Sequence, residues 1–144
     1  MYYKDGDRYE GGFLNNKREG KGVYHWKNGD KFEGIFVQDQ IQGSGIYHYM
    51  SGGRYDGEFE KGKKHGRGIY FSKDGSKYDG DWMYGKFNGV GTMEYADGGK
   101  YSGDWKDDER HGNGSMYYED GDVYIGEWRF DKRYGMGVMK FGDE

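Results

Sequence analysis

One pattern recurs along the whole sequence at a fixed interval of 23 residues. It consists of two aromatic residues on either side of a glycine, each separated from it by one residue, and a Gly-x-Gly follows every copy. With one further glycine column, these positions hold 24 of the 30 glycines. Self-similarity at such a period predicts a repeat architecture. The aromatic-x-Gly-x-aromatic copies begin at Tyr9, Phe32, Tyr55, Tyr78, Tyr101 and Tyr124. The predicted repeats are 9–31, 32–54, 55–77, 78–100, 101–123 and 124–144, after the end of a partial repeat at 1–8.

Each repeat contains two stretches in which side chains alternate with a period of two, as strands require. In the second repeat, Phe32, Gly34 and Phe36 share one face, while Lys31 and Glu33 lie on the other. A sheet that is apolar on one side only is typical of antiparallel pairing. We therefore expect an all-β fold: an elongated, single-layer antiparallel β-meander of six 23-residue hairpins, wound into a solenoid-like twisted ribbon.

The strand register follows from parity, because directly opposed residues point to the same face. A three-residue loop at 27–29 between repeats opposes Tyr24 to Phe32, with Gly29 in the left-handed region. Within a repeat, a six-residue loop at 37–42 opposes Phe36 to Gly43. The column of Asn16, Asp39, Gly62, Gly85, Asp108 and Asp131 tolerates a positive φ angle at every position, so we expect a left-handed residue there.

Together these registers predict a row of glycines across the sheet, with aromatic rows on both sides of it. Rings can lean over this glycine floor because no side chain blocks them, and each ring can bury about 150–250 Å². The main role of these rings is structural, because packing on glycine holds the sheet together. The trough between them is also the best candidate for binding a partner, which would be an extended peptide or a helix. The candidate groove residues are Tyr24, Phe32, Tyr47, Tyr55, Tyr70, Tyr78, Trp82, Tyr101, Trp105, Tyr124 and Trp128.

Composition narrows the class of protein. The chain has no proline and no cysteine, which excludes collagen and leaves neither a disulfide framework nor a thiolate metal site. Aromatic residues make up 19% of the chain, which argues against disorder. No apolar run approaches the roughly 20 residues of a transmembrane helix, and the first residues do not form a signal peptide. A net charge of −4 argues against nucleic-acid binding.

No residue pattern supports catalysis, and we expect no catalytic residue, cofactor or metal ion. His25 and His48 share a column about 9–10 Å apart, too far for two ligands of one zinc ion. His65 and His111 lie where a loop meets a strand. The acidic residues of the polar face, such as Asp81 and Asp104, alternate with basic ones, which favours solvent-exposed ion pairs over a carboxylate site.

The segment 78–91, with the sequence YDGDWMYGKFNGVG, resembles the repeat of the MORN (membrane occupation and recognition nexus) family. The segments at 62–68 and 110–114 carry the His-Gly-x-Gly that is typical of that family. The resemblance covers essentially the whole chain, but the Gly-Lys of the loop is absent from several repeats. It implies an elongated single-layer hairpin array that acts as a scaffold, often in ciliary axonemes, other cytoskeletal structures or membrane junctions.

Two functions follow from these features. The first is a non-catalytic scaffold, cytoplasmic and associated with the cytoskeleton or a cilium, that binds other proteins through the groove or its end strands, including self-association. The alternative is a peripheral membrane module that binds anionic phospholipids, although neighbouring acidic residues would offset much of the attraction. Its candidate basic loop tips are Lys17, Arg18, Lys63, Lys64, Lys132 and Arg133.

Overall fold

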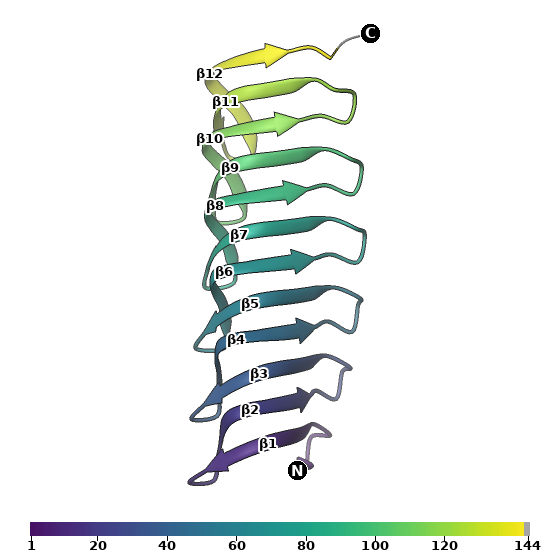
Figure 1. Cartoon of the computed structure of the whole chain (residues 1–144), viewed down its shortest axis with the longest axis vertical. Coiled ribbons are helices and arrows are strands. Elements are labelled where there is room, and N and C mark those ends of the chain that lie inside the picture. The colour runs from purple at the N-terminus through teal and green to yellow at the C-terminus, as the bar shows by residue number, and fades with distance from the viewer. Residues whose placement is uncertain (143–144) are drawn as a thin grey trace.

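A computed structural model describes residues 1–142 and shows twelve antiparallel strands in one open sheet. The strands follow one another in sequence order along the long axis, and the two termini lie at opposite ends (Figure 1). The predicted all-β, single-layer architecture is confirmed, and the last two residues of the sixth repeat lie outside the described part. The strands are β1 (Arg8–Leu14), β2 (Lys17–His25), β3 (Lys31–Val37), β4 (Gln40–His48), β5 (Arg54–Glu60), β6 (Lys63–Phe71), β7 (Lys77–Met83), β8 (Lys86–Glu94), β9 (Lys100–Lys106), β10 (Glu109–Tyr117), β11 (Val123–Arg129) and β12 (Lys132–Lys140).

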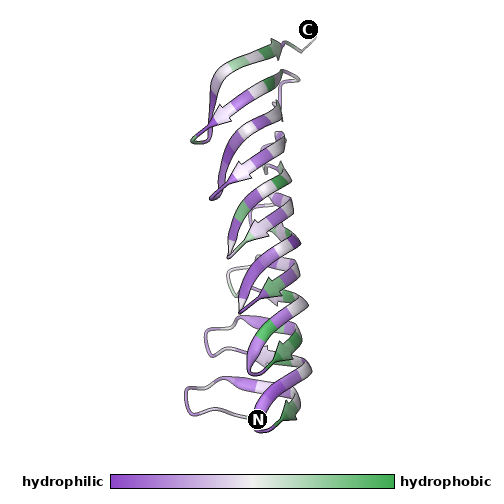
Figure 2. Cartoon of the chain, turned by 90° about the vertical axis from the view of Figure 1, so that its left-hand side faces the viewer, coloured by the Kyte–Doolittle hydropathy of each residue, from purple (hydrophilic) through white to green (hydrophobic). Residues whose placement is uncertain are grey.

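The strands are strongly curved when seen from the side (Figure 2). The buried aromatic side chains all lie on one face, which we call the inner face, and the opposite face is the outer face. Hydrophilic and hydrophobic residues alternate along the strands, as the two-residue period requires (Figure 2). The core is therefore a single layer of packed side chains, mostly rings, on one side of the sheet, without a second layer of backbone.

The turns between repeats match the predicted three-residue loop. Tyr24 pairs with Phe32, and Gly22 pairs with Gly34. Gly29 has a φ of 103°, a left-handed conformation that glycine adopts without a steric penalty. The side chain of Asn28 accepts a hydrogen bond from the backbone N–H of Asp30, 2.9 Å away, which closes the turn locally.

The turns within repeats differ from the predicted six-residue loop. Phe36 pairs with Ile41 in its own hairpin and not with Gly43, so the loop has only two residues, Gln38 and Asp39. Both have positive φ angles, 47° and 71°, as in a type I′ turn. The predicted left-handed column is confirmed, and the residue before it is left-handed as well.

A β-bulge explains why the rest of the predicted register still holds. Between the pairs Gly34–Gly45 and Phe36–Ile41, β4 has two more residues than β3, and Gly43 within this bulge has a φ of 75°. Two extra residues leave the side-chain parity unchanged. Because Ile41 pairs with the inward-facing Phe36, Ile41 and its equivalents also lie on the inner face, where sequence reasoning did not place them.

The two ends of the sheet are not equivalent. Tyr2 forms an isolated bridge with Arg8, and the Met1 ammonium donates a hydrogen bond to the Tyr9 carbonyl oxygen at 2.6 Å. Residues 1–3 thus cover part of the β1 edge. Within the described residues, β12 pairs only with β11. No helix in this part of the chain is long and apolar enough to cross a membrane.

Candidate functional site

The inner face contains a continuous series of buried rings, which we call the core ladder. Neighbouring rings meet edge to face, with centroids 5.0–5.5 Å apart and interplanar angles of 82–89°. This geometry is the one that the ring quadrupole favours. The ladder consists of Tyr9, Phe32, Phe36, Tyr55, Phe59, Tyr78, Trp82, Tyr101, Trp105, Tyr124 and Trp128, each at most 7% exposed.

The polar atoms of the ladder bind the backbone around the glycines. The Tyr78 hydroxyl donates to the carbonyl oxygen of Asp81 at 2.7 Å, and the indole N–H of Trp82 donates to that of Gly68 at 3.0 Å. The same bonds recur at the tyrosines and tryptophans of other repeats. Buried hydroxyl and indole groups are thereby satisfied, and the rings are fixed over the glycine floor.

The predicted groove is therefore filled by its own side chains. Of the eleven candidate groove residues, only Tyr47 and Tyr70 are half-buried, and the other nine are buried. Phe32, Tyr55, Tyr78 and Tyr101 have no exposed surface at all. The buried nine are part of the protein core, because the glycine floor lets them pack against the backbone. They do not offer the open contact surface that the sequence suggested.

The accessible part of the inner face is a row beside the ladder, which we call the rim row. Its rings pack against the buried core and against the aromatic residues beside it, as Trp26 does against Tyr47 with centroids 5.1 Å apart, and they stay partly exposed. The rim row consists of Tyr3, Trp26, Tyr49, Ser72, Tyr95 and Tyr118, all half-buried.

In the first two repeats, the tyrosine next to the rim row donates a hydrogen bond from its hydroxyl group to an aspartate carboxylate. Tyr24 donates to Oδ2 of Asp7 at 2.6 Å, and Tyr47 donates to Oδ2 of Asp30 at 2.7 Å. Burial, reinforced by the hydrogen bond to Asp7, raises the pKa of Tyr24 to about 12. The Tyr24 hydroxyl and the backbone N–H of Lys27 lower the pKa of Asp7. These tyrosines are thus structural hydrogen-bond donors at neutral pH.

A second row on the inner face was missed by sequence reasoning, and we call it the cation row. It is the second residue after each two-residue turn, and it faces inward because it pairs with an inward-facing ring. A sequence signal existed, since each turn ends in glycine, asparagine or aspartate, as type I′ turns prefer. The cation row consists of Arg18, Ile41, Lys64, Phe87, Arg110 and Arg133.

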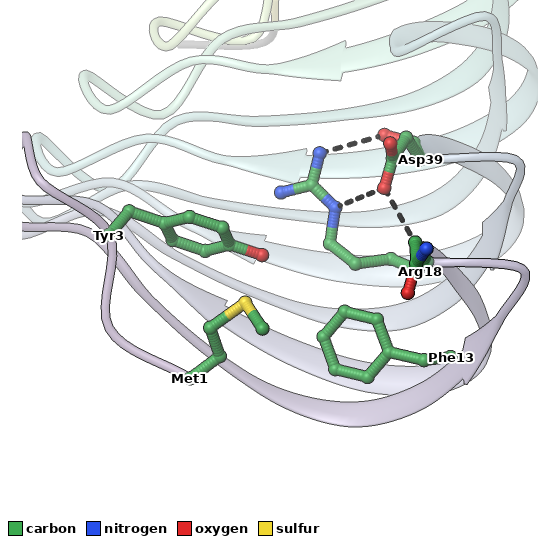
Figure 3. Close-up of a pocket in the computed structure, with 6 residues that line it drawn as sticks. Met1, Tyr3, Phe13, Arg18 and Asp39 are labelled. Carbon is green, nitrogen blue, oxygen red and sulfur yellow. Dashed lines mark hydrogen bonds and ion pairs between the residues drawn. The ribbon is translucent and has the colours of Figure 1, made fainter.

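The cations of this row lie over aromatic rings. The Arg18 guanidinium is 5.0 Å from the centroid of Tyr24, and the Arg110 guanidinium is 4.8 Å from that of Trp128. Arg18 also bonds Asp39, with Nε 3.1 Å from Oδ1, at the inner side of the curved strands (Figure 3). Donation by the backbone N–H and the guanidinium of Arg18 lowers the pKa of Asp39.

The predicted basic loop tips divide into two groups. Lys17, Lys63 and Lys132 are exposed beside the turns, whereas the exposed Arg133 is a cation-row residue whose guanidinium lies 5.5 Å from the centroid of the Tyr124 ring. Arg18 and Lys64 are half-buried residues of β2 and β6 whose charged groups pack over rings, so they are not loop tips. Two-residue turns bring these side chains onto the inner face.

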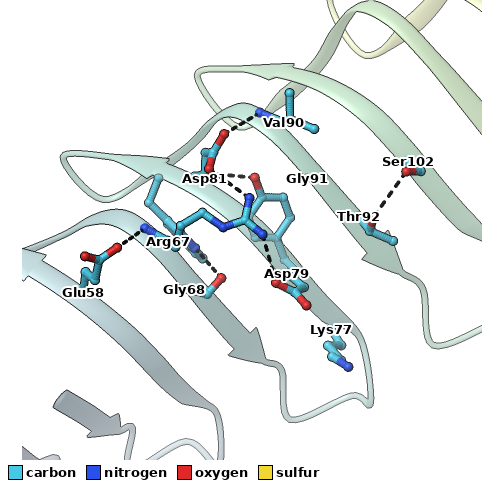
Figure 4. Close-up of polar contacts among 12 residues, drawn as sticks. Glu58, Arg67, Gly68, Lys77, Asp79, Asp81, Val90, Gly91, Thr92 and Ser102 are labelled. Atoms are coloured by element: carbon cyan, nitrogen blue, oxygen red, sulfur yellow. Dashed lines mark hydrogen bonds and ion pairs between the residues drawn. The ribbon is translucent and has the colours of Figure 1, made fainter. Parts of the chain in front are cut away.

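The acidic residues of the outer face have a structural role that sequence reasoning did not identify. Asp81 Oδ2 accepts the backbone N–H of Val90 at 3.0 Å (Figure 4). In the next repeat, Asp104 Oδ2 accepts the backbone N–H of Asn113 at 3.0 Å. Glu58 and Glu127 cap the equivalent bulges in their repeats. Ion pairs also occur on this face, such as that of Arg67 with Asp81 at 3.0 Å.

His65 has a structural role too. Its Nδ1 accepts the backbone N–H of Tyr84 in the next hairpin at 3.3 Å, and its Nε2 lies 3.5 Å from Glu60. His25 and His48 lie on the outer face, each between two basic residues of neighbouring strands. A basic environment of this kind does not favour a bound cation.

Comparison with known proteins identifies one family, and several solved structures match the chain. The MORN repeat model matches residues 9–31, 32–54, 55–77, 78–100, 101–123 and 124–144. Comparison with curated protein sequences gives no significant match. The TCP domain of SAS-4 (dCPAP) from Drosophila melanogaster, solved with a proline-rich motif of Ana2 (dSTIL), is similar in structure. Its TM-score is 0.60 at 14% identity, over 97% of this chain and 75% of that one.

The second structure is the TCP10 domain of Danio rerio CPAP in complex with a peptide of STIL. It has a TM-score of 0.38 at 17% identity, and the match covers 95% of this chain and 65% of that one. At the 14% identity of the Drosophila domain, the likeness shows a shared fold.

Proposed function

The chain belongs to the MORN repeat family, and from this premise we propose that it is a non-catalytic scaffold that binds other proteins along its inner face. The observation that carries this proposal is the rim row, whose half-exposed rings run along the long axis of the sheet. Aromatic residues are enriched at protein interfaces because they bury a large area with few rotatable bonds. The hydroxyl and indole N–H groups of the ladder all form hydrogen bonds with the protein's own backbone. We therefore expect the inner face to act by contacting other proteins.

An extended peptide fits this surface best. The rim row is long and narrow, and tyrosine and tryptophan rings form grooves that take extended or proline-rich segments. The Drosophila domain of the same fold was solved with a proline-rich motif of another protein, which supports a peptide ligand. We propose that the protein is cytoplasmic and belongs to a cytoskeletal or ciliary assembly, in line with the scaffold role of the family. The edge of β12, which pairs only with β11 among residues 1–142, offers a second contact for a partner or for another copy.

Proximity labelling in cells, combined with co-purification, tests the scaffold. The variant combines Tyr95→Ser and Tyr118→Ser, because serine occupies the same rim position at Ser72 and is tolerated there. We expect partner recovery to fall about tenfold, equivalent to about 1.4 kcal/mol, while the melting temperature changes little. Tyr117→Ser, one residue away on the outer face, is the matched control and should keep the partners. Equal recovery with the rim variant would contradict binding at the rim row.

The membrane alternative retains one supporting observation. Exposed apolar residues such as Leu14, Met83 and Phe130 lie at the hairpin turns, beside the exposed Lys17 and Lys132. An edge with both features suits an anionic membrane surface. Arg18 and Lys64 pack over rings and so no longer count among the basic loop tips, which weakens the expected attraction to anionic lipids. Flotation with phosphatidylserine vesicles at physiological salt decides this, since a chain that stays at the bottom of the gradient rules the alternative out.

A further inference from the structure

The cation row contains an ion pair that is built the same way in two repeats. The backbone N–H of Arg18 donates to Oδ1 of Asp39 at 2.8 Å, and its Nε donates to the same oxygen at 3.1 Å. In the fifth repeat, Arg110 contacts Asp131 through the same atoms at 3.1 and 2.6 Å. In both cases a carboxylate from the turn of the next repeat pairs with a cation beside the aromatic ladder.

The third repeat has the cation but lacks the carboxylate. Lys64 holds the cation position, and Gly85 stands where Asp39 and Asp131 stand in the other pairs. The backbone is in the same place, because the Gly85 N–H donates to the Lys64 carbonyl oxygen at 2.8 Å, as Asp39 and Asp131 donate to Arg18 and Arg110. A Cβ built at Gly85 meets no atom within 4 Å, so the space for the missing side chain is open.

The Lys64 ammonium lies among rings. Its Nζ donates to the Tyr49 hydroxyl at 3.0 Å and lies 5.0 Å from the centroid of the Trp82 ring and 5.4 Å from that of Tyr70. Among residues 1–142, no carboxylate oxygen is within 4.0 Å of it. Burial lowers the pKa of Lys64. A cation in such surroundings favours a charge-assisted bond to an anion more than an exposed lysine does.

A hollow of about 310 Å³ opens in front of this lysine. Asp108 lines the hollow, but the Oδ1 atom of Asp108 accepts a hydrogen bond from the backbone N–H of Phe87 at 2.8 Å. Asp108 therefore pairs with the next residue of the cation row and not with Lys64. The hollow thus has a cation, aromatic walls and the empty position of a carboxylate. Its lining is Tyr49, Lys64, Tyr70, Trp82, Gly85, Phe87 and Asp108.

We propose that this hollow binds the side-chain carboxylate of an aspartate or glutamate in a partner peptide, with the Lys64 ammonium and backbone N–H as its donors. The partner carboxylate takes the place that Asp39 and Asp131 fill within the chain in the first and fifth repeats. Tyr70 and Trp82 contact the methylene groups and neighbouring residues of the peptide. The inference rests on the proposed function, since it specifies the chemistry of the peptide that the inner face accepts.

Three variants isolate the site. Lys64→Met keeps most of the apolar stem over the rings and removes the charge. Gly85→Asp restores the missing carboxylate from within the chain, at a turn position where Asp39 and Asp131 already have φ angles of 71° and 66°. Gly62→Asp is the matched control: Gly62 also donates to the preceding cation-row residue and has open space at its Cβ, but that residue is Ile41.

The first measurement needs no partner. Side-chain NMR of Lys64 is followed through a pH titration in the wild type, in Gly85→Asp and in Gly62→Asp. We expect the pKa of Lys64 to rise in Gly85→Asp alone, because a carboxylate at that position pairs with the ammonium. An unchanged pKa would show that a carboxylate placed there does not reach the lysine. That result would overturn this inference and leave the scaffold proposal intact.

The second measurement selects ligands from a displayed library of random 12-residue peptides on the immobilised full chain. We expect the selected peptides to share one acidic residue, and binding to weaken about tenfold when it is replaced by its amide or when the chain carries Lys64→Met or Gly85→Asp. Gly62→Asp should bind like the wild type. Peptides without an acidic residue, or equal binding to Gly85→Asp, would overturn the inference only. Failure to select any peptide would overturn the inference and the peptide-binding form of the proposed function together.

Discussion

The glycine floor is what permits rings to act as the core of this sheet. Each of these glycines lies beneath a tyrosine or phenylalanine of the core ladder, and a side chain there would displace the ring. A Cβ at Gly91 would lie 2.6 Å from Cε2 of Tyr78, closer than real Cβ contacts allow. The glycine is therefore required by the packing of the ring and not by an unusual backbone conformation.

Gly91→Ala tests this requirement. We expect it to destabilise the fold by about 3 kcal/mol, since Tyr78 must leave its position and break its hydrogen bond to Asp81. Thr92→Ala, the next residue on the outer face, is the control and should change stability by less than about 0.5 kcal/mol. Both are measured by urea unfolding. A Gly91→Ala chain as stable as the control would refute the role of the floor.

Buried tyrosines also determine how the protein responds to alkali. Burial raises the pKa of Tyr24 to about 12 and raises that of Tyr55 and Tyr78 as well, whereas the unfolded value is near 10. Folded-state pKa values above the unfolded ones leave stability intact below pH 10 and reduce it as pH rises from there towards the folded values. Tyrosinate absorbance and far-UV circular dichroism should change together above pH 10. Ionisation of all tyrosines near pH 10 with an intact sheet would contradict this.

At the scale of the element, most of the hairpin can be predicted and its bulge cannot. The two-residue period identifies the strands and their faces, and turn chemistry identifies Gly29 and Asp39 as left-handed. A bulge with two extra residues preserves parity, so the pairing of Phe36 with Ile41 leaves no trace in the pattern of faces. The inward direction of Arg18 and Lys64 follows from the equivalent pairing in their repeats, which is why they seemed to be loop tips.

The sequence pattern also does not predict how deeply the aromatic rings of the inner face are buried. Periodicity assigns Tyr55 and Trp82 to one face, but it does not say whether rings on that face form an open groove or close upon each other. Edge-to-face packing over glycine closes them. The rings left for a partner are those farther from the floor, such as Tyr95 and Tyr118 of the rim row.

Carboxylate caps stabilise the bulge in the last four repeats, and Asp104 tests their contribution. Asp104→Ala leaves the backbone N–H of Asn113 without its acceptor, so we expect a loss of about 0.5–1.5 kcal/mol in unfolding free energy. Asp56→Ala is the comparison, since Asp56 lies on the same face opposite Ile46 and Ile69 without such a role. Thermal melts of both variants give the difference, and equal melting temperatures would exclude the capping role.

At the scale of the whole molecule, each hairpin packs only against its neighbours, as in other solenoids. Deletion of residues 78–100 removes one repeat and joins Lys77 to Tyr101, which has the same place in its repeat as Tyr78. We expect a folded chain that is shorter by about 10 Å, two strand spacings, and somewhat less stable. Circular dichroism and sedimentation velocity check this outcome. A deletion variant that fails to fold would show that the repeats are not interchangeable units.

The central claim is that one layer of sheet is held together by its own rings, and small-angle X-ray scattering of the isolated chain tests it most directly. We expect a radius of gyration well above the roughly 14–15 Å of a globular chain of this length. The cross-section should be that of one sheet and should stay constant with concentration, because association through β12 lengthens the particle without thickening it. A compact particle, or a cross-section that doubles as two sheets pack face to face, would contradict the account.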